Sequence, residues 1–260
     1  MTLRFLQKWH GAGNDFLVDV LDYGTAAWWT ADRVRAACDR HHGVGADGVV
    51  VAEVGAEGHA GHEVVMSLFN ADGSRAEMSG NGIRCLAAGV RRATRGRWTE
   101  LDVLTDAGLR TVEFDRDDPS WATVDMGEVE LLAAPAGAMG AARVGNPHVV
   151  VLDDAAWSHA ERDARAAELS AAAGGANVEF IRIEPTGRVA MRVLERGVGW
   201  TMACGTGSCA VAAVLRAQGR VGDRVVVANP GGDLEVSLQG ARARLRGPVA
   251  FVGNVEWSTH

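Results

Sequence analysis

Two short stretches of the sequence place a small nucleophilic side chain directly before a glycine-rich run. Residues 76–85 read AEMSGNGIRC, in which Ser79 precedes the glycines, and residues 201–210 read TMACGTGSCA, in which Cys204 does. Both runs turn apolar with helical spacing, so each residue is predicted to start a helix. A helix N-terminus carries unpaired N–H groups and partial positive charge, and glycines let a carboxylate approach it closely.

Each of the two residues has a structural as well as a chemical interpretation. A serine before glycine is a common helix cap, and a cysteine in an apolar run is often only a packing residue. In the chemical interpretation the helix N-terminus lowers the thiol pKa, so that Cys204 is reactive near neutral pH. Ser79 and Cys204 then act on opposite faces of one Cα, one removing its proton and the other returning it. Such an inversion requires no metal and no organic cofactor.

The two stretches belong to a repeat that runs through the whole chain. GNDFLVDVLD from Gly13 is similar to GNPHVVVLDD from Gly145, and two further pairs follow in the same order, at separations of about 120 to 132 residues: DAGLRTVEF with GGDLEVSL, and TVDMGEV with ARLRGPV. This predicts two similar domains. We place the N-terminal domain at residues 1–125 plus about 249–260 and the C-terminal domain at 126–248, with a Pro/Gly-rich connection near the boundary.

The elements that must position these residues follow from local patterns. Alternating or β-branched runs predict strands at residues 63–70, 101–106, 148–154, 177–184 and 188–195. Helices are predicted after Ser79, after Cys204 and within residues 155–173. The helix after Cys204 is apolar nearly all round, as is typical of a helix enclosed by a sheet. The expected fold class is α/β (α+β), with one strongly buried helix in each half.

Composition narrows the class of protein. With 260 residues, 47% hydrophobic and 23% charged, and a net charge of −7, the chain is predicted to bind neither nucleic acid nor a membrane surface. No apolar run is long enough to span a membrane, no signal peptide is recognisable, and the four cysteines form no CxxC pair, which together predict a cytoplasmic enzyme with free thiols. Lys8, the only lysine, lies in a predicted strand, which argues against pyridoxal phosphate. The paired histidines, at 41–42 and at 59 and 62, are expected to be exposed rather than metal-bound.

The chain resembles the diaminopimelate epimerase family over nearly its full length. The stretches that carry the resemblance are HGAGNDF, CDRHHGVGADG, FNADGSRAEMSGNGIRC, GNPH, NVEF, ERGVGWTMACGTGSCA, and GG.L followed by RGPV..VG. The resemblance implies two similar domains, each a β-barrel-like sheet wrapped around a central helix. It also implies cofactor-free interconversion of L,L- and meso-diaminopimelate, on the route to lysine and peptidoglycan, by a protein that forms homodimers.

Position by position, the resemblance implies catalytic residues at Cys204 and at Ser79, where the family has its first catalytic cysteine. The positions of the α-carboxylate cradle are Gly80, Asn81, Gly205 and Thr206. The other substrate-binding positions, and a supporting histidine, are Asn14, Asn70, Asn146, Asn177, Glu195, Arg196 and His148. Such a set suits a small-molecule substrate with two zwitterionic ends, because Arg and Asn bind carboxylate oxygens while Glu pairs with an amine. A surface ion pair at 195–196 and turn roles for the asparagines are the structural alternatives.

The serine at position 79 departs from the family's pattern. A hydroxyl is a much weaker acid than a thiol and needs a neighbouring base, and the nearest candidate in the sequence is Glu77. Three explanations stay open: a natural variant that still moves protons, an engineered replacement of cysteine, and a chain that has drifted to another reaction or to binding alone. The function is therefore predicted to be that of a diaminopimelate epimerase. The alternatives are a racemase of the same fold for another amino acid and a silent or low-activity diaminopimelate-binding variant.

Overall fold

The structure is a computed structural model that describes residues 2–55, 64–96 and 98–259. It divides into two compact units, which are treated separately below. The first unit comprises Met1–Val124 with Pro248–His260, and the second comprises Asp125–Gly247.

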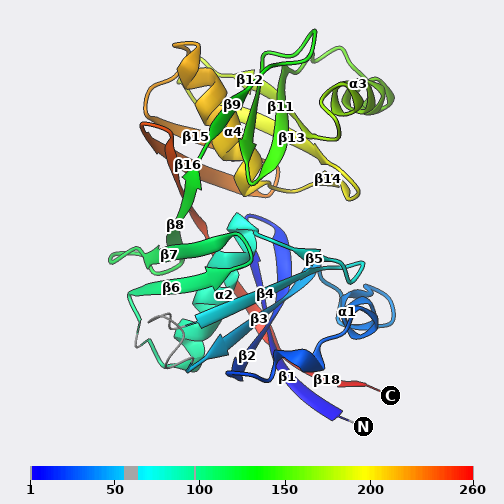
Figure 1. The fold of residues 1–260 in the computed structure, drawn as a ribbon, viewed down its shortest axis with the longest axis vertical. Helices are drawn as coiled ribbons and strands as arrows, with labels where there is room; N and C mark the ends of the chain where they lie inside the picture. Colours follow the sequence, from blue (N-terminus) through cyan, green and yellow to red (C-terminus); the bar gives the residue numbers. More distant parts are fainter. Residues whose placement is uncertain (1, 56–63, 97, 260) are drawn as a thin grey trace. The chain divides into compact units, whose positions relative to one another are not determined.

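The first unit contains one helix enclosed by strands and a shorter helix on the outside (Figure 1). Its elements are β1 (Thr2–Gly11), β2 (Asn14–Asp22), a 3-10 turn η1 (Ala26–Trp28), α1 (Ala31–Cys38), β3 (Gly48–Val54), β4 (Val64–Asn70), β5 (Arg75–Ala76), α2 (Gly80–Ala93), β6 (Glu100–Thr105), β7 (Gly108–Phe114), β8 (Trp121–Glu128) and β18 (Ala250–Thr259). Strand β8 continues past the division at Val124 into the second unit.

The second unit repeats the same series of elements. They are β9 (Glu130–Leu132), β10 (Gly140–Val144), β11 (Asn146–Leu152), α3 (His159–Ala172), β12 (Asn177–Ile183), β13 (Val189–Glu195), β14 (Gly199–Thr201), α4 (Gly205–Ala217), β15 (Arg224–Asn229), β16 (Gly232–Gln239) and β17 (Arg242–Pro248). The strands predicted from the sequence are confirmed as β4, β6, β11, β12 and β13, and the helices as α2, α3 and α4; residue 63 lies outside the described residues.

Strand pairing confirms that the two halves share one topology. In the first unit β2 runs parallel to β3, β3 antiparallel to β4, and β4 parallel to β6. In the second unit β11, β12, β13 and β15 pair in the same senses and order. Two parallel neighbouring strands need a crossover connection. Helix α2 lies in the crossover from β4 to β6, and α4 lies in the crossover from β13 to β15.

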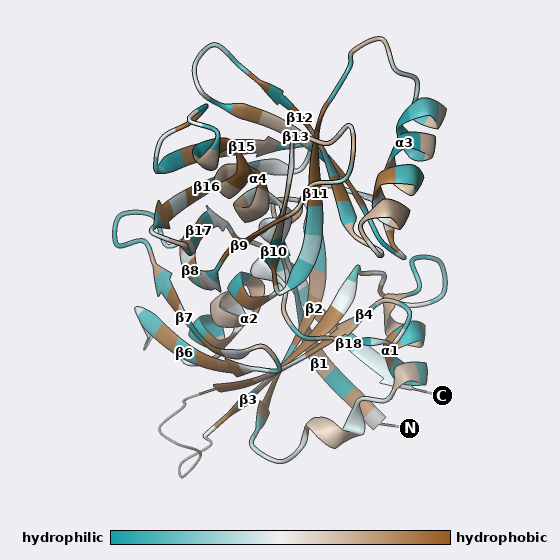
Figure 2. Cartoon of the chain, turned by 45° about the horizontal axis from the view of Figure 1, so that its top comes forward, coloured by the Kyte–Doolittle hydropathy of each residue, from teal (hydrophilic) through white to brown (hydrophobic). Residues whose placement is uncertain are grey.

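Each central helix lies inside the curl of its own sheet, as the sequence predicts. Helix α2 is buried from Gly80 to Val90 and packs mainly against β1 and β2, while α4 packs mainly against β10 and β16. The outer helices cover the opposite face of the sheet: Val34 of α1 packs with Val49, and Leu169 of α3 packs with Phe180. In Figure 2, α3 accordingly mixes hydrophilic and hydrophobic residues, as expected for a helix with one face in solvent.

Candidate active site

Ser79 is the N-cap of α2. Its backbone is extended (φ −141°, ψ 122°), and its hydroxyl accepts a hydrogen bond from the Gly82 N–H at 3.0 Å. The structural interpretation of Ser79 as a cap is therefore confirmed. The side chain is half-buried, whereas Glu77, the base candidate nearest in sequence, is exposed.

Two of the predicted substrate-binding asparagines of the first unit, Asn14 and Asn81, contact each other at this helix start. Asn81 Nδ2 donates to Asn14 Oδ1 at 3.3 Å, and Asn14 Nδ2 donates to Asp47 Oδ2 at 2.7 Å. Asn70 ends β4, opposite the first residue of β3, and donates to Ser74 Oγ at 3.0 Å. The start of α2 and the start of β2 thus bring two side-chain amides together, those of Asn81 and Asn14.

Two charged residues that the sequence analysis did not single out hold these amides. Arg84 is fully buried, and its guanidinium donates to the Gly80 carbonyl at 2.9 Å and to Asn81 Oδ1 at 2.7 Å. Asp47 accepts from Asn14 and is bridged by Arg40 to Asp15. An arginine inside an otherwise apolar helix was the signal available in the sequence, because a buried cation needs nearby acceptors.

Cys204 is the N-cap of α4 in the same geometry (φ −123°, ψ 115°). Its sulfur accepts from the Gly207 N–H at 3.3 Å and lies 3.3 Å from Thr206 Oγ1. Its backbone N–H donates to Asn229 Oδ1 at 3.4 Å, which ties the helix start to the end of β15. The residue is 5% exposed, so the thiol is held close to the protein surface but is almost fully enclosed.

The thiol pKa of Cys204 contradicts the expectation from the sequence. Burial, followed by the negative charges of Glu195 and Glu179, raises this pKa well above its ordinary value. The hydrogen bonds from Thr206 and from the Gly207 N–H lower the pKa, but by less. The prediction of a lowered pKa was wrong because it considered the helix terminus alone, whereas strands β12 and β13 bring two carboxylates toward the sulfur.

His148 and Glu179 form a buried pair beside Cys204. Both side chains are fully buried, and His148 Nδ1 lies 2.6 Å from Glu179 Oε1. His148 Nε2 lies 3.0 Å from Asn146 Oδ1. The sequence analysis named His148 as supporting but did not single out Glu179, although an acidic residue inside the apolar run NVEF was a visible signal.

The remaining predicted residues of the second unit lie at the adjoining strand ends. Asn177 is opposite His148 in the parallel β11–β12 pair, and its Oδ1 accepts from the Arg196 backbone N–H at 3.0 Å. Glu195 ends β13 and accepts from the Thr201 hydroxyl at 2.5 Å. The Arg196 side chain is exposed and donates to the Gly175 carbonyl at 3.2 Å.

The donor set of the second unit includes one cluster with metal-ligand chemistry. One ligand atom each of His148, Glu179 and Cys204 lie within 4.8 Å of one another. His148 and Glu179 already share a short hydrogen bond, so a metal ion would have to displace its proton. Residues 41 and 42 are exposed, as expected, while residues 59 and 62 lie outside the described residues.

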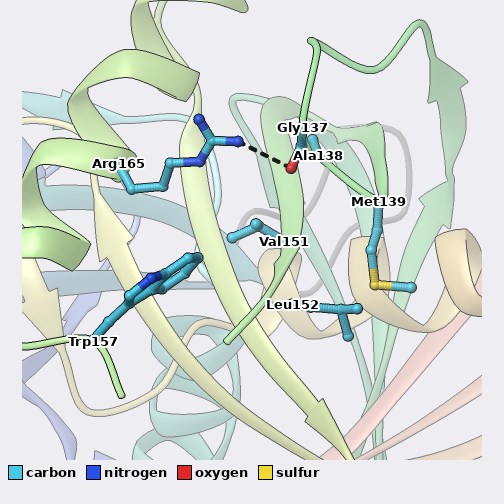
Figure 3. Close-up of a pocket in the computed structure, with 7 residues that line it drawn as sticks. All are labelled: Gly137, Ala138, Met139, Val151, Leu152, Trp157 and Arg165. Carbon is cyan, nitrogen blue, oxygen red and sulfur yellow. Dashed lines mark hydrogen bonds between the residues drawn. The ribbon is translucent and has the colours of Figure 1, made fainter. Parts of the chain in front are cut away.

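A surface pocket in the second unit contains none of the predicted site residues. It has a volume of about 540 Å³ and is lined by Gly137, Ala138, Met139, Val151, Leu152, Trp157 and Arg165. Figure 3 shows the Arg165 guanidinium at its edge, donating to the Gly137 carbonyl at 3.2 Å. Separately, none of the helices in the described part of the chain is both long and apolar enough to cross a membrane.

Known proteins match the chain along nearly its whole length. It is 37% identical to the diaminopimelate epimerase of Synechocystis sp. (98% of this chain, 100% of that protein) and 39% identical to that of Rhodococcus opacus (96% and 96%). It is also 38% identical to the O-ureido-serine racemase of Streptomyces lavendulae (96% and 94%).

Solved structures share the fold at low sequence identity. A hydroxyproline epimerase from Agrobacterium vitis matches with a TM-score of 0.70 at 17% identity (99% of this chain, 91% of that chain). A phenazine biosynthesis protein of the PhzF family from Bacillus anthracis matches with a TM-score of 0.75 at 12% identity (100% of both chains). The sequence description of the diaminopimelate epimerase family covers residues 6–132 and 140–252, and the chain belongs to that family.

Proposed function

We propose that this protein is a cofactor-independent amino-acid epimerase that interconverts L,L- and meso-diaminopimelate. The observation that carries the proposal is the pair of equivalent helix N-termini, each capped by a side chain that can carry a proton. Ser79 and Cys204 have the same backbone conformation and each accept the N–H of the glycine three positions later. The diaminopimelate epimerases among the relatives, at 37–39% identity, support the choice of substrate.

The helix starts supply the electrostatics that such a reaction needs. Removal of an α-proton places negative charge on Cα and on the α-carboxylate, and a helix N-terminus favours an anion. We assign this stabilisation to the first turns of α2 and α4, at Gly80-Asn81 and at Gly205-Thr206. Nothing larger than glycine would leave the same access to the backbone at positions 80 and 205.

The proton transfers are assigned to the two caps. Cys204, once deprotonated, takes the α-proton of one stereoisomer, and it returns a proton in the reverse direction. Ser79 serves the opposite face of Cα, with the handicap that a hydroxyl is a poor acid and a poor base. Glu195 pairs with a substrate ammonium group, while Arg196 and the asparagines bind carboxylate oxygens at the distal end.

A racemase of another amino acid is the second candidate. The O-ureido-serine racemase of Streptomyces lavendulae is as similar to this chain as the diaminopimelate epimerases are. A protein that binds diaminopimelate without epimerising it is the third, because Ser79 replaces the thiol that the family uses. The exposed Arg196 at the end of β13 favours a substrate with a second charged end over a small neutral one.

A stereochemical assay distinguishes these functions. The purified protein is incubated with L,L-diaminopimelate and, separately, with O-ureido-serine, serine and proline, and the stereoisomers are quantified by chiral chromatography. We expect meso-diaminopimelate to form and the other substrates to stay unchanged. Inversion of another amino acid alone would establish the second candidate, and binding of diaminopimelate with no inversion would establish the third.

The unlike caps predict an asymmetric exchange of the α-proton in deuterium oxide. Exchange should begin faster from the stereoisomer whose Cα–H faces Cys204, because a thiolate is the better base. The Cys204→Ala variant should lose exchange from that isomer. Equal initial rates from both isomers would refute the asymmetry, and full exchange in Cys204→Ala would refute the mechanism.

A homodimer and a cytoplasmic location complete the proposal. The family resemblance supports the dimer, and the sequence composition supports the location. Sedimentation velocity of the purified protein tests the first, and fractionation of the cells that produce it tests the second. A monomer at working concentration, or a protein recovered outside the cytoplasm, would overturn the respective part.

A further inference from the structure

Glu179 is a buried carboxylate of which one oxygen is hydrogen-bonded and the other is not. Its Oε1 lies 2.6 Å from His148 Nδ1, while its Oε2 is buried and accepts no hydrogen bond from the described part of the chain. A buried carboxylate oxygen without a donor is costly, by about 1–3 kcal/mol. Such a group therefore calls for a functional explanation.

The first turn of α4 is shaped around this carboxylate. A Cβ on Gly207 would lie 2.6 Å from Glu179 Oε1, so a larger residue at that position would force the carboxylate to move. The same Gly207 donates its N–H to the Cys204 sulfur. The carboxylate thus sits directly beneath the helix start that holds the thiol, and one ligand atom of each residue lie within 4.8 Å of each other.

The hydrogen bonds of His148 determine where the proton of the pair lies. His148 Nε2 lies 3.0 Å from Asn146 Oδ1, and we assign a hydrogen to this nitrogen so that it donates to the amide oxygen. One further proton is shared between His148 Nδ1 and Glu179 Oε1. When that proton is on His148, Oε2 belongs to an ionised carboxylate and can accept a proton; when it is on Oε1, the carboxyl is neutral and Oε2 can accept only a hydrogen bond.

We propose that Glu179 is the internal proton acceptor of Cys204, acting through Oε2, and that it thereby generates the thiolate that attacks the α-proton. The S–H bond of Cys204 breaks, the electron pair stays on sulfur, and the proton forms an O–H bond on Glu179 Oε2. When the shared proton is on His148, Cys204 changes from thiol to thiolate and Glu179 from carboxylate to carboxylic acid, while His148 stays an imidazolium. Net charge is unchanged, and the thiolate gains a nearby cation. This inference rests on the proposed function.

The transfer is physically reasonable over the observed distance. At up to 4.8 Å the sulfur and the carboxylate are not in direct hydrogen bond, so a rotation of the Cys204 side chain or one bridging water closes the gap. Burial, followed by the charges of Glu195 and Glu179, raises the thiol pKa of Cys204, so free thiolate is scarce at neutral pH. A proton acceptor inside the protein forms the thiolate without placing a second negative charge in the site.

In the described part of the first unit, no carboxylate occupies the position equivalent to Glu179. The repeat aligns Phe16 with His148, and through the two strand registers Gly48 then corresponds to Asn177 and Val50 to Glu179. Val50 is a buried apolar residue, and the charged groups near the start of α2 are Arg84 and Asp47, the latter reached through Asn14. The carboxylate therefore accompanies the thiol half of the Ser79/Cys204 pair alone.

The test measures thiol ionisation and turnover in the same variant. In Glu179→Gln, which keeps the size of the side chain and its acceptor oxygen, the ultraviolet thiolate titration of Cys204 should move to lower pH because a negative charge is removed. The α-proton exchange kcat should fall by about 10²–10⁴-fold, the usual contribution of a positioned acid or base, with KM unchanged. Glu168→Gln, at an exposed carboxylate on α3, is the matched control and should change neither quantity.

A second variant separates proton transfer from packing. Glu179→Asp retains a carboxylate, so its kcat for α-proton exchange should be at least about tenfold higher than that of Glu179→Gln. This is expected of a general base that is displaced but still present. Equal losses of exchange in both variants would indicate a packing role and overturn the inference. An unchanged kcat in Glu179→Gln, together with a thiol titration moved to lower pH, would overturn it as well. If the unmodified protein exchanges no α-proton at all, the proposed function fails first and this inference fails with it.

Discussion

At the scale of single residues, the two helix caps are alike in geometry and unlike in chemistry. Ser79 Oγ and Cys204 Sγ accept equivalent N–H groups at 3.0 and 3.3 Å, a difference that matches the larger radius of sulfur. Each atom therefore has a structural reason to be where it is. The hydroxyl at position 79 caps the helix as well as a thiol would. Serine in place of cysteine therefore affects only the proton transfer.

Restoring a thiol at position 79 is the direct test of that statement. Ser79→Cys should keep the cap and raise the rate of α-proton exchange, by up to about 10²–10⁴-fold if the hydroxyl contributes nothing as an acid or base. Ser79→Ala is the control: it should show no gain and should lose about 1 kcal/mol of stability with the cap. An unchanged rate in Ser79→Cys would show that position 79 is not a proton-transfer position.

At the scale of elements, each central helix approaches its sheet closely through one glycine. In the first unit the glycine is on the helix: a Cβ at Gly89 of α2 would lie 2.7 Å from Val18 Cγ1 of β2. In the second unit the glycine is on the strand: a Cβ at Gly140 of β10 would lie 2.4 Å from Val214 Cγ1 of α4. The repeat therefore preserves the close approach of helix and sheet, but not the element that carries the small residue.

The close approach in the second unit predicts a specific loss of stability. Gly140→Ala forces its methyl group against Val214 and should lower the free energy of unfolding by about 1–3 kcal/mol, the usual cost of overpacking. Urea denaturation followed by circular dichroism measures the change. In Gly140→Ala combined with Val214→Ala the loss should be smaller than the sum of the single losses, because the clash is removed.

Gly253 provides the matched control for this substitution. It lies in strand β18, and a Cβ there meets nothing within 4 Å. Gly253→Ala should therefore leave stability within about 0.5 kcal/mol of the unmodified protein. Equal effects of the two glycine substitutions would contradict the assigned packing.

At the scale of the whole molecule, the buried thiols determine how the fold responds to alkaline pH. Burial raises the thiol pKa of Cys38 and of Cys85 to about 12, and that of Cys204 well above its ordinary value. A thiol whose folded-state pKa exceeds its unfolded value contributes its full stability below the unfolded pKa. It loses that contribution as pH rises toward the folded pKa, since the unfolded chain then binds fewer protons.

The unfolding free energy should therefore decline steeply in alkali. Between pH 9 and pH 11 Cys38 and Cys85 each remove up to about 1.4 kcal/mol per pH unit, while stability near pH 7 is unaffected. Thermal or urea unfolding at a series of pH values gives the slope. Cys85→Ala should unfold more readily near pH 7, where the thiol contributes packing, and should show a shallower alkaline slope; an identical slope would refute the attribution to buried thiols.

The sequence alone determined the features that depend on spacing along the chain. Helical and alternating periodicities predicted α2, α3, α4 and the main strands, and the internal repeat predicted two halves of one topology. Both caps were also readable, because a cap bonds to an N–H only three positions away. The family resemblance added positions such as Asn14 and Glu195, and their roles stay predictions.

Only the tertiary structure decided the environment of Cys204. Glu179 and His148 are 31 residues apart and meet because β11 and β12 pair in parallel, and Glu195 reaches the thiol from β13. These contacts reverse the direction in which the helix terminus alone would shift the thiol pKa. Spacing along the chain specifies which side chains share a helix or strand face, whereas burial and long-range strand pairing specify the charges that surround them.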